Sequence, residues 1–401
     1  MRLIIHRGTH QIGGCAAEVR TDAARILIDL GSELPDEDGL THPDTLQISG
    51  VMEGAQNCDG VFFTHYHNDH IGLIDKILPG IPLYMGESAR EIALLLNRRI
   101  AHAPHTDRTA AIAALERAQA FVPGVAITVG DIRVTPYLID HSAFDAYFFL
   151  IEAQGVRVLH TGDFRLHGFR GGKTLAMLKQ YVGQVDWLIC DGTLLSRDAA
   201  HIKSERELQD DERALMKRYK RVFVLCASTN LDRIAGFYHA RPDARPLVCD
   251  GFQKSLLDAV SARHGGKSSL YRFPYAFPYS EQNQKLLSLM DERGFVMLLR
   301  VNDWSRKMLE KYGEGAVVAY SMWEGYLRGK DNALSAMLAG HPSVYMHTSG
   351  HAATEDTIHL CDTVDPRCGV IPIHTLSPKR FSELLPGRHI ELLRDGEVFA
   401  L

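Results

Sequence analysis

The segment Thr64-His65-Tyr66-His67-Asn68-Asp69-His70 (THYHNDH) constrains this 401-residue chain more than any other feature. It follows the apolar run VFF, which is typical of a buried strand, and it holds three histidines and one aspartate. Residues i and i+2 of extended backbone point the same way, so His65 and His67 can converge on one ion. We expect the chain to turn into a helix at His70, so that the side chains of Asp69 and His70 point away from the first ion and toward a second one. The motif therefore predicts two metal ions side by side at a strand end.

Each predicted ion needs further ligands from other strand ends. His141 follows the run LID, Asp163 follows VLHTG and His374 ends the run VIPI. A carboxylate has two oxygens, so Asp163 can bridge both ions, while His141 completes the first site and His374 the second. Nitrogen and oxygen ligands suit two Zn²⁺ ions, with Mn²⁺ as a substitute, and leave a bridging position for hydroxide.

The spacing of apolar runs predicts an α/β chain with an interruption. Short β-branched runs recur over residues 1–195, longer charged helical segments alternate with single strands over 196–340, and strands return over 341–401. Within the first part we expect helices over 71–78 and from Ser88, where Ser88 and Glu91 fit a capping box. The chain is thus expected to form one large-sheet domain, 1–195 and 341–401, interrupted by a smaller α/β domain.

Composition narrows the class of protein. No apolar run reaches the roughly 20 residues of a membrane span, so we expect no membrane association and a cytoplasmic location. The seven cysteines are scattered without C-x-x-C spacing, which indicates buried free thiols rather than disulfides or a thiolate zinc site. Residues 196–340 carry 23 Lys and Arg against 18 Asp and Glu, whereas the remainder has a net charge of −10. A basic insert keeps nucleic acid open as a partner.

The motifs HxHxDH, DHS, TGDF and a late histidine resemble the metallo-β-lactamase superfamily. Asp191 in DGT, the segment GAVVAYSMWEGY, His351 in TSGHA and His374 in IPIHT are similar to the β-CASP nucleases, among them ribonuclease J. The resemblance implies an αββα sandwich with an inserted β-CASP domain. It does not extend to the C-terminal domain of ribonuclease J, which we expect this chain to lack. It assigns His65, His67 and His141 to the first ion and Asp69, His70 and His374 to the second, with Asp163 bridging.

The same resemblance implies roles around a phosphate. His351 would contact the scissile phosphate and protonate the leaving oxygen, Asp191 would orient His351, and Asp69 would help to hold the attacking hydroxide. Ser349 and Gly350 could add hydrogen bonds to the phosphate. The loop CASTNLDR, with Ser228, Asn230 and Arg233, resembles a phosphate-binding loop; its alternative interpretation is an ordinary turn in which Asn230 or Thr229 caps a helix.

These residues favour a metal-dependent nuclease that hydrolyses phosphodiester bonds of single-stranded RNA, or of DNA, through a hydroxide between two metal ions. Exonuclease and endonuclease action both remain open, as does assembly into a homo-oligomer. Two alternatives stand beside it. One is a small-molecule metallo-hydrolase acting on thioesters, lactones or phosphoesters, and the other is a non-catalytic binding subunit that retains the metals.

Overall fold

The computed structural model describes the chain except for residues 36–39, 41, 197–201, 243 and 329–331. The chain divides into two compact units. Unit 1 contains Met1–Asp36, Leu40–Ile202 and Gly350–Leu401, and unit 2 contains Lys203–Ser349. The division lies later than the sequence placed it at both ends, at 203 instead of 196 and at 349 instead of 340. Segment TSGH is thus divided between the units.

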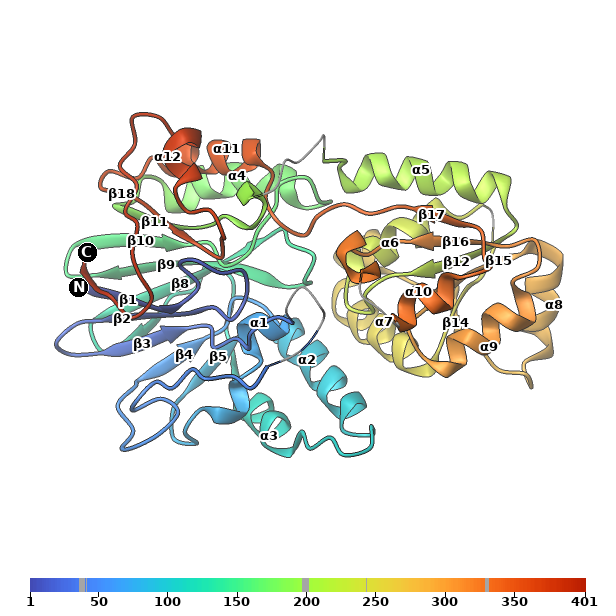
Figure 1. Ribbon diagram of the computed structural model, residues 1–401, viewed down its shortest axis with the longest axis horizontal. Helices are drawn as coiled ribbons and strands as arrows, with labels where there is room; N and C mark the ends of the chain where they lie inside the picture. Colours follow the sequence, from blue (N-terminus) through green and yellow to red (C-terminus); the bar gives the residue numbers. More distant parts are fainter. Residues whose placement is uncertain (36–39, 41, 197–201, 243, 329–331) are drawn as a thin grey trace. The chain divides into compact units, whose positions relative to one another are not determined.

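Unit 1 contains two stacked sheets with helices outside them (Figure 1). The first sheet has the order β19-β1-β2-β3-β4-β5-β6. Its strands are β1 (Arg2–Arg7), β2 (Ala16–Arg20), β3 (Arg25–Ile28), β4 (Gly60–Phe62), β5 (Leu83–Met85), β6 (Gln119–Ala120) and β19 (Val398–Ala400). The second sheet has the order β18-β11-β10-β9-β8-β7. Its strands are β7 (Ile127–Val129), β8 (Ile132–Ile139), β9 (Ala146–Ala153), β10 (Val156–His160), β11 (Trp187–Asp191) and β18 (Gly369–Ile373).

Alternating side chains of the second sheet fill two hydrophobic cores. Phe149 and Ile151 of β9 pack with Phe62 in the core between the sheets, whereas Phe148 and Leu150 pack against the outer helices. Both faces of this sheet are buried, which explains the nearly continuous apolar runs in its strands. The helices of unit 1 are α1 (Asn68–Ile71), α2 (Glu87–Ile100), α3 (Thr109–Arg117), α4 (Thr174–Met177), α11 (Thr354–Val364) and α12 (Arg380–Leu384).

Unit 2 is a parallel sheet with helices around it, of order β14-β13-β15-β12-β16-β17. Its strands are β12 (Arg221–Leu225), β13 (Leu247–Cys249), β14 (Ala276–Pro278), β15 (Phe295–Leu299), β16 (Val317–Tyr320) and β17 (Ser343–Tyr345). Its helices are α5 (Glu205–Arg218), α6 (Leu231–Ala240), α7 (Gly251–His264), α8 (Gln284–Arg293), α9 (Asp303–Tyr312) and α10 (Ala333–Leu338). The predicted fold class, a two-sheet αββα sandwich with an inserted α/β unit, is confirmed.

Two local predictions were wrong. Residues 71–78 do not form one helix, because α1 ends at Ile71 and the backbone N–H of Leu73 donates to Leu30 O (3.1 Å). Ser88 does not cap α2, which begins one residue earlier, at Glu87. The carboxylate of Asp145 accepts from the backbone N–H groups of Ser88 and Ala89 instead, at 2.9 and 3.0 Å. A carboxylate distant in sequence thus satisfies the start of this helix.

Candidate metal centre

The candidate ligands converge because strand ends meet at one edge of unit 1. β8 and β10 both run antiparallel to β9, and β10, β11 and β18 are mutually parallel, so these four strands end at the same edge of the second sheet. His141, Asp163 and His374 follow three of these strands, and Asp191 is the last residue of β11. The segment after β4 supplies the remaining candidates.

A first histidine group consists of His65, His67 and His141. The ring centroids lie 4.6–5.0 Å apart, and His141 Nε2 is 3.2 Å from His67 Nδ1. Burial is the main cause that lowers the pKa of His67 to about 4 and holds the pKa values of His65 and His141 well below the usual range. The three rings are therefore neutral at pH 7, which is the form that coordinates a metal ion.

A second ligand group consists of Asp69, His70, Asp163 and His374. His70 Nε2 lies 3.1 Å from Asp163 Oδ2, and His374 Nε2 lies 3.2 Å from Asp69 Oδ2. Asp163 Oδ2 is also 3.9 Å from His65 Nε2 and 4.0 Å from His141 Nε2 of the first group. Asp163 thus stands between the two groups, where the sequence had placed a bridging carboxylate.

The surroundings fix which nitrogen of each ring faces the centre. His141 Nδ1 lies 2.6 Å from the carbonyl oxygen of Gly350, which can only accept, so Nδ1 carries the proton and Nε2 the lone pair. His70 Nδ1 likewise lies 2.8 Å from Asp29 Oδ2, and His374 Nδ1 lies 2.6 Å from Thr193 Oγ1. Such outer partners orient metal-binding histidines and raise their basicity.

The sequence did not predict that Asp29 and Thr193 orient two of these histidines. Asp29 is fully buried, has a φ of 60°, and also accepts from the N–H and hydroxyl of Thr64, both at 2.7 Å. Its signal was an aspartate directly after the apolar run ILI. Thr193 is the last residue of the DGT motif, and its hydroxyl donates to Asp191 Oδ1 at 2.6 Å.

The charges of the second ligand group support one another. Burial would lower the pKa of His70 and of His374, but neighbouring carboxylates, Asp163 foremost, raise both well above the usual value. Burial would raise the pKa of Asp69 and Asp163, yet the nearby histidines lower both. These carboxylates are therefore ionised, as metal ligands must be, whereas His70 and His374 would each release a proton when a metal ion binds.

Two buried atoms indicate that the donor set suits a metal ion. Neither His65 Nε2 nor Asp163 Oδ1 has a hydrogen-bond partner. A buried polar atom without a partner costs roughly 1–3 kcal/mol, so such atoms call for an explanation. A cation bound among the lone pairs would satisfy both. Neutral imidazole nitrogens and carboxylate oxygens are ligands that zinc and manganese accept.

His351 stands beside the second ligand group. Its Nδ1 lies 3.0 Å from Asp191 Oδ2 and 3.7 Å from Asp163 Oδ2. Burial would lower the pKa of His351, but the charges of Asp191 and Asp163 outweigh it and raise the pKa. The side chain remains 23% exposed, whereas His65, His70, His141 and His374 are buried. The structure thus brings Asp191 and His351 together as the sequence predicted.

The residues predicted to contact a phosphate are arranged differently. Gly350 holds His141 through its carbonyl oxygen, and a Cβ there would lie 2.3 Å from Ser142 Oγ, so a larger residue would require Ser142 to move. Ser349 is half-buried at the end of unit 2. Within unit 2, Ser228 is half-buried, and its carbonyl oxygen accepts from Gln253.

Asn230 and Arg233 favour the structural alternative. The side chain of Asn230 accepts from the N–H of Arg233 (3.1 Å) and caps α6. The guanidinium of Arg233 is fully buried and donates to both carboxylate oxygens of Glu205, at 3.0 and 3.1 Å, and to Ser321 and Met346 O. The donors of Arg233 are thus used within unit 2, which favours the interpretation of this loop as an ordinary turn that caps a helix.

Comparison with known proteins agrees with this architecture. The model of the β-lactamase superfamily domain matches residues 24–215. Ribonuclease J of Sinorhizobium meliloti is 27% identical, with 87% of this chain and 63% of that protein aligned. Ribonuclease J of Synechocystis is also 27% identical, with 98% of this chain and 64% of that protein aligned. The chain thus spans less than two thirds of the length of these two relatives.

A solved structure shares the fold over the whole chain. The crystal structure of a protein of unknown function from Enterococcus faecalis V583 matches with a TM-score of 0.78 and 24% identity, covering 100% of this chain and 99% of that one. In the described part of the chain, no helix has the length and apolar character needed to cross a membrane. The chain thus matches the β-lactamase superfamily domain over residues 24–215 and is similar to proteins named ribonuclease J over most of its length.

Proposed function

We propose that this chain is a metal-dependent nuclease that hydrolyses phosphodiester bonds of single-stranded RNA in preference to DNA, and that it acts in the cytoplasm. The pairing of His351 with Asp191 beside Asp163 is the observation that carries the proposal. A hydrolase of thioesters or lactones needs the metal ligands but has no need of this additional pair. The relatives named ribonuclease J support RNA as the substrate.

The ligand groups define where ions would be held. His65, His67 and His141 would hold the first ion and Asp69, His70 and His374 the second, with Asp163 between them. When bound, two ions would lower the pKa of a water between them and stabilise charge on phosphate oxygens. Asp69 and Asp163, both ionised and buried, would accept hydrogen bonds from that water and so orient it.

His351 would act on the other side of the phosphate. Its Nδ1–H donates to Asp191 Oδ2, which fixes the ring and favours the protonated form. The proton to be transferred is then the one on Nε2, and it would pass to the oxygen that leaves phosphorus. Asp191 is itself held by the N–H and hydroxyl of Thr193, at 2.8 and 2.6 Å, so the donor is positioned by a rigid strand end.

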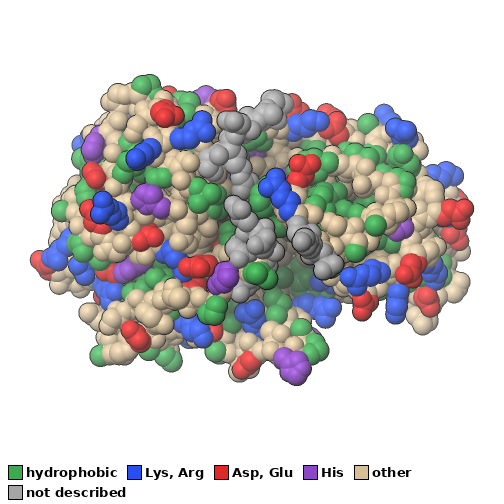
Figure 2. Space-filling view, viewed as in Figure 1, with side chains coloured by type: hydrophobic (Ala, Val, Ile, Leu, Met, Phe, Trp, Pro, Cys, Tyr) green, Lys and Arg blue, Asp and Glu red, His purple; other side chains and the backbone are tan. Residues whose placement is uncertain are grey.

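Unit 2 would supply general contacts to the nucleic-acid backbone. The segment KRYKR starts with Lys217 and Arg218, which form the last turn of α5. On the face seen in Figure 2, Lys and Arg side chains are interspersed with Asp and Glu rather than gathered in one patch. We therefore expect moderate affinity for single strands, with specificity coming from the centre itself.

The test compares wild-type protein loaded with Zn²⁺ or Mn²⁺ with two variants, His351→Ala and His359→Ala. His359 is an exposed histidine of the same C-terminal segment, on α11, and serves as the matched control. Substrates are end-labelled single-stranded RNA and DNA with either a 5′-phosphate or a 5′-hydroxyl, together with a thioester and a lactone. The 5′-end series and the product lengths also distinguish exonuclease from endonuclease action.

We expect cleavage of RNA by wild type and His359→Ala, and a loss of about 10²–10⁴-fold in His351→Ala, the usual contribution of a general acid. Full RNA cleavage by His351→Ala would refute its role as proton donor. Turnover of the thioester or lactone without cleavage of any nucleic acid would refute the nuclease proposal.

A further inference from the structure

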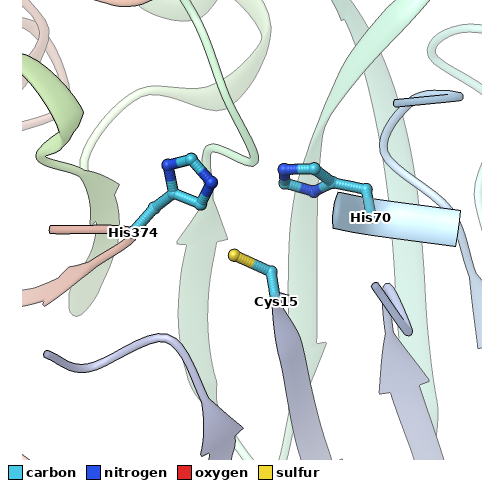
Figure 3. A group of neighbouring side chains, drawn as sticks. All are labelled: Cys15, His70 and His374. Carbon is cyan, nitrogen blue, oxygen red and sulfur yellow. The ribbon is translucent and has the colours of Figure 1, made fainter. Parts of the chain in front are cut away.

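One cysteine lies among the candidate metal ligands. The Sγ of Cys15 and one ring nitrogen of each of His70 and His374 lie within 4.8 Å of one another, and all three residues are buried. Figure 3 shows the sulfur atom pointing toward the two rings, which come from α1 and from the end of β18. Scattered cysteines without C-x-x-C spacing had argued against any thiolate ligand, so this placement was not predicted.

The backbone holds Cys15 firmly at this position. Its N–H donates to Asp69 O at 2.9 Å, and its carbonyl oxygen accepts from the N–H of Gly31 at 3.0 Å. Cys15 directly precedes β2, so its Cα is set by the sheet and by the segment that carries two second-group ligands. A Cβ at Gly8 would lie 3.5 Å from the sulfur, which places backbone closely on its other side.

An unsatisfied carboxylate oxygen lies beside one of the same histidines. Asp163 Oδ1, which is buried and without a hydrogen-bond partner, lies 3.8 Å from His374 Nδ1. Sulfur and nitrogen ligands of a tetrahedral zinc ion lie about 3.3–3.6 Å apart, as bond lengths of ~2.3 Å to sulfur and ~2.0–2.1 Å to nitrogen require.

The other cysteines have no such setting. Cys58 is buried and donates to Gly60 O, Cys190 and Cys361 lie in the core between the second sheet and its helices, Cys226 and Cys249 are buried in unit 2, and Cys368 is exposed. Among the cysteines that the structure describes, Cys15 alone belongs to a group of candidate ligands. Packing alone would be served by alanine or valine at this position, whereas a sulfur atom adds a soft ligand.

We propose that Cys15 supplies a thiolate ligand to the second metal position, where with His70 and His374 it forms a sulfur and nitrogen ligand set beside the carboxylates. This inference rests on the proposed metal centre. Binding converts the thiol and a divalent ion into a metal thiolate and one released proton, with no change of oxidation state. A soft thiolate selects Zn²⁺ over Mn²⁺, so the second position is a zinc site even where manganese is abundant.

The experiment replaces the native ions of the full chain with Co²⁺ and records the near-ultraviolet absorption. Cobalt bound to a thiolate gives an intense charge-transfer band that nitrogen and oxygen ligands do not produce. The variants are Cys15→Ser and, as control, Cys368→Ser. RNA cleavage and total cobalt content are measured on the same samples, and competition between Zn²⁺ and Mn²⁺ is followed by metal analysis after dialysis.

We expect the band in wild type and Cys368→Ser and its loss in Cys15→Ser, together with at least a tenfold fall in the preference for Zn²⁺ over Mn²⁺. Wild-type protein that binds cobalt and cleaves RNA without the band would refute the thiolate and leave the proposed function intact. Protein that binds no cobalt would refute the metal centre and, with it, both proposals. The wild-type spectrum alone decides the question if Cys15→Ser does not fold.

Discussion

Replacing Asp29 with asparagine tests how the fold selects the metal-binding nitrogen of His70. Asp29 Oδ1 accepts from the N–H of Thr64, and Oδ2 accepts from the Thr64 hydroxyl and faces His70 Nδ1. An amide nitrogen cannot take the Oδ1 place, because it would meet the Thr64 N–H, donor against donor. The amide nitrogen must therefore take the Oδ2 place, where it donates a hydrogen bond to His70 Nδ1. His70 Nδ1 then has to be the unprotonated nitrogen of the ring. The His70 proton then moves to Nε2, the nitrogen that faces Asp163.

The magnitude follows from this change of tautomer. Removing the outer partner of a metal-binding histidine typically costs 10–100-fold in affinity, or about 1.4–2.8 kcal/mol. We expect the larger loss at the second position, because Asp29 faces His70 directly and reaches the first histidine group only through the Thr64 hydroxyl, which lies 3.1 Å from His65 Nδ1. Three charge-assisted hydrogen bonds also become neutral, at about 1 kcal/mol each, so the free energy of unfolding should fall by about 3 kcal/mol.

Asp145→Asn provides the matched control. Asp145 is also buried, has a φ of 65° where Asp29 has 60°, and accepts from two backbone N–H groups and the hydroxyl of Tyr147. It touches no histidine through these bonds. Zinc affinity is measured by competition with a chelator, and stability by urea unfolding of the metal-free protein. Asp145→Asn should lose stability and retain zinc affinity; equal zinc affinity in Asp29→Asn and wild type would refute the tautomer argument.

Three further changes test other parts of the structure. Gly350→Ala should displace the backbone that holds the first histidine group and lower its metal occupancy, because the new Cβ meets Ser142 Oγ at 2.3 Å; adding Ser142→Gly should restore occupancy in metal analysis. Arg233→Met should leave Glu205 buried without its partner and lower the free energy of unfolding by about 3–5 kcal/mol in urea titrations, whereas unchanged stability would contradict the buried pair. The pKa of Glu18 is lowered in the folded protein, because hydrogen bonds from His6 and Arg25 outweigh the effect of burial. Glu18 therefore stabilises the fold at pH values above its unfolded pKa of about 4.5, and this contribution disappears as the pH falls through the folded pKa. Unfolding of Glu18→Gln between pH 6 and 3 should therefore show a smaller acid dependence than wild type.

The convergence of distant ligands could be predicted because it depends on strand direction. His141, Asp163 and His374 each follow an apolar run, and parallel strands end at one edge of a sheet. The alternation of side-chain direction in extended backbone likewise separates His65 and His67 from Asp69 and His70. Such rules are local to each strand and need no knowledge of the partner.

Features that depend on tertiary partners could not be predicted in this way. Ser88 fits a capping box by sequence, yet Asp145, which lies 57 positions later, takes the helix N–H. Arg233 fits a phosphate loop, but Glu205 on the neighbouring helix consumes its donors. The position of Cys15 beside His374 depends on the pairing of residues at opposite ends of the chain, and no spacing in the sequence carries that information.

The pairing of β11 with β18 gives the centre a definite place in the order of folding. These strands are neighbours in one sheet, yet Asp191 and its partner Ile373 are separated by the whole of unit 2. Contacts between residues so far apart form late, because a long loop must close before they contribute. His374 directly follows β18. During synthesis, His65 and His67 of the first histidine group are therefore present long before His374 can complete the second position. The proposed metal centre is therefore complete only once the last strand of the second sheet has docked.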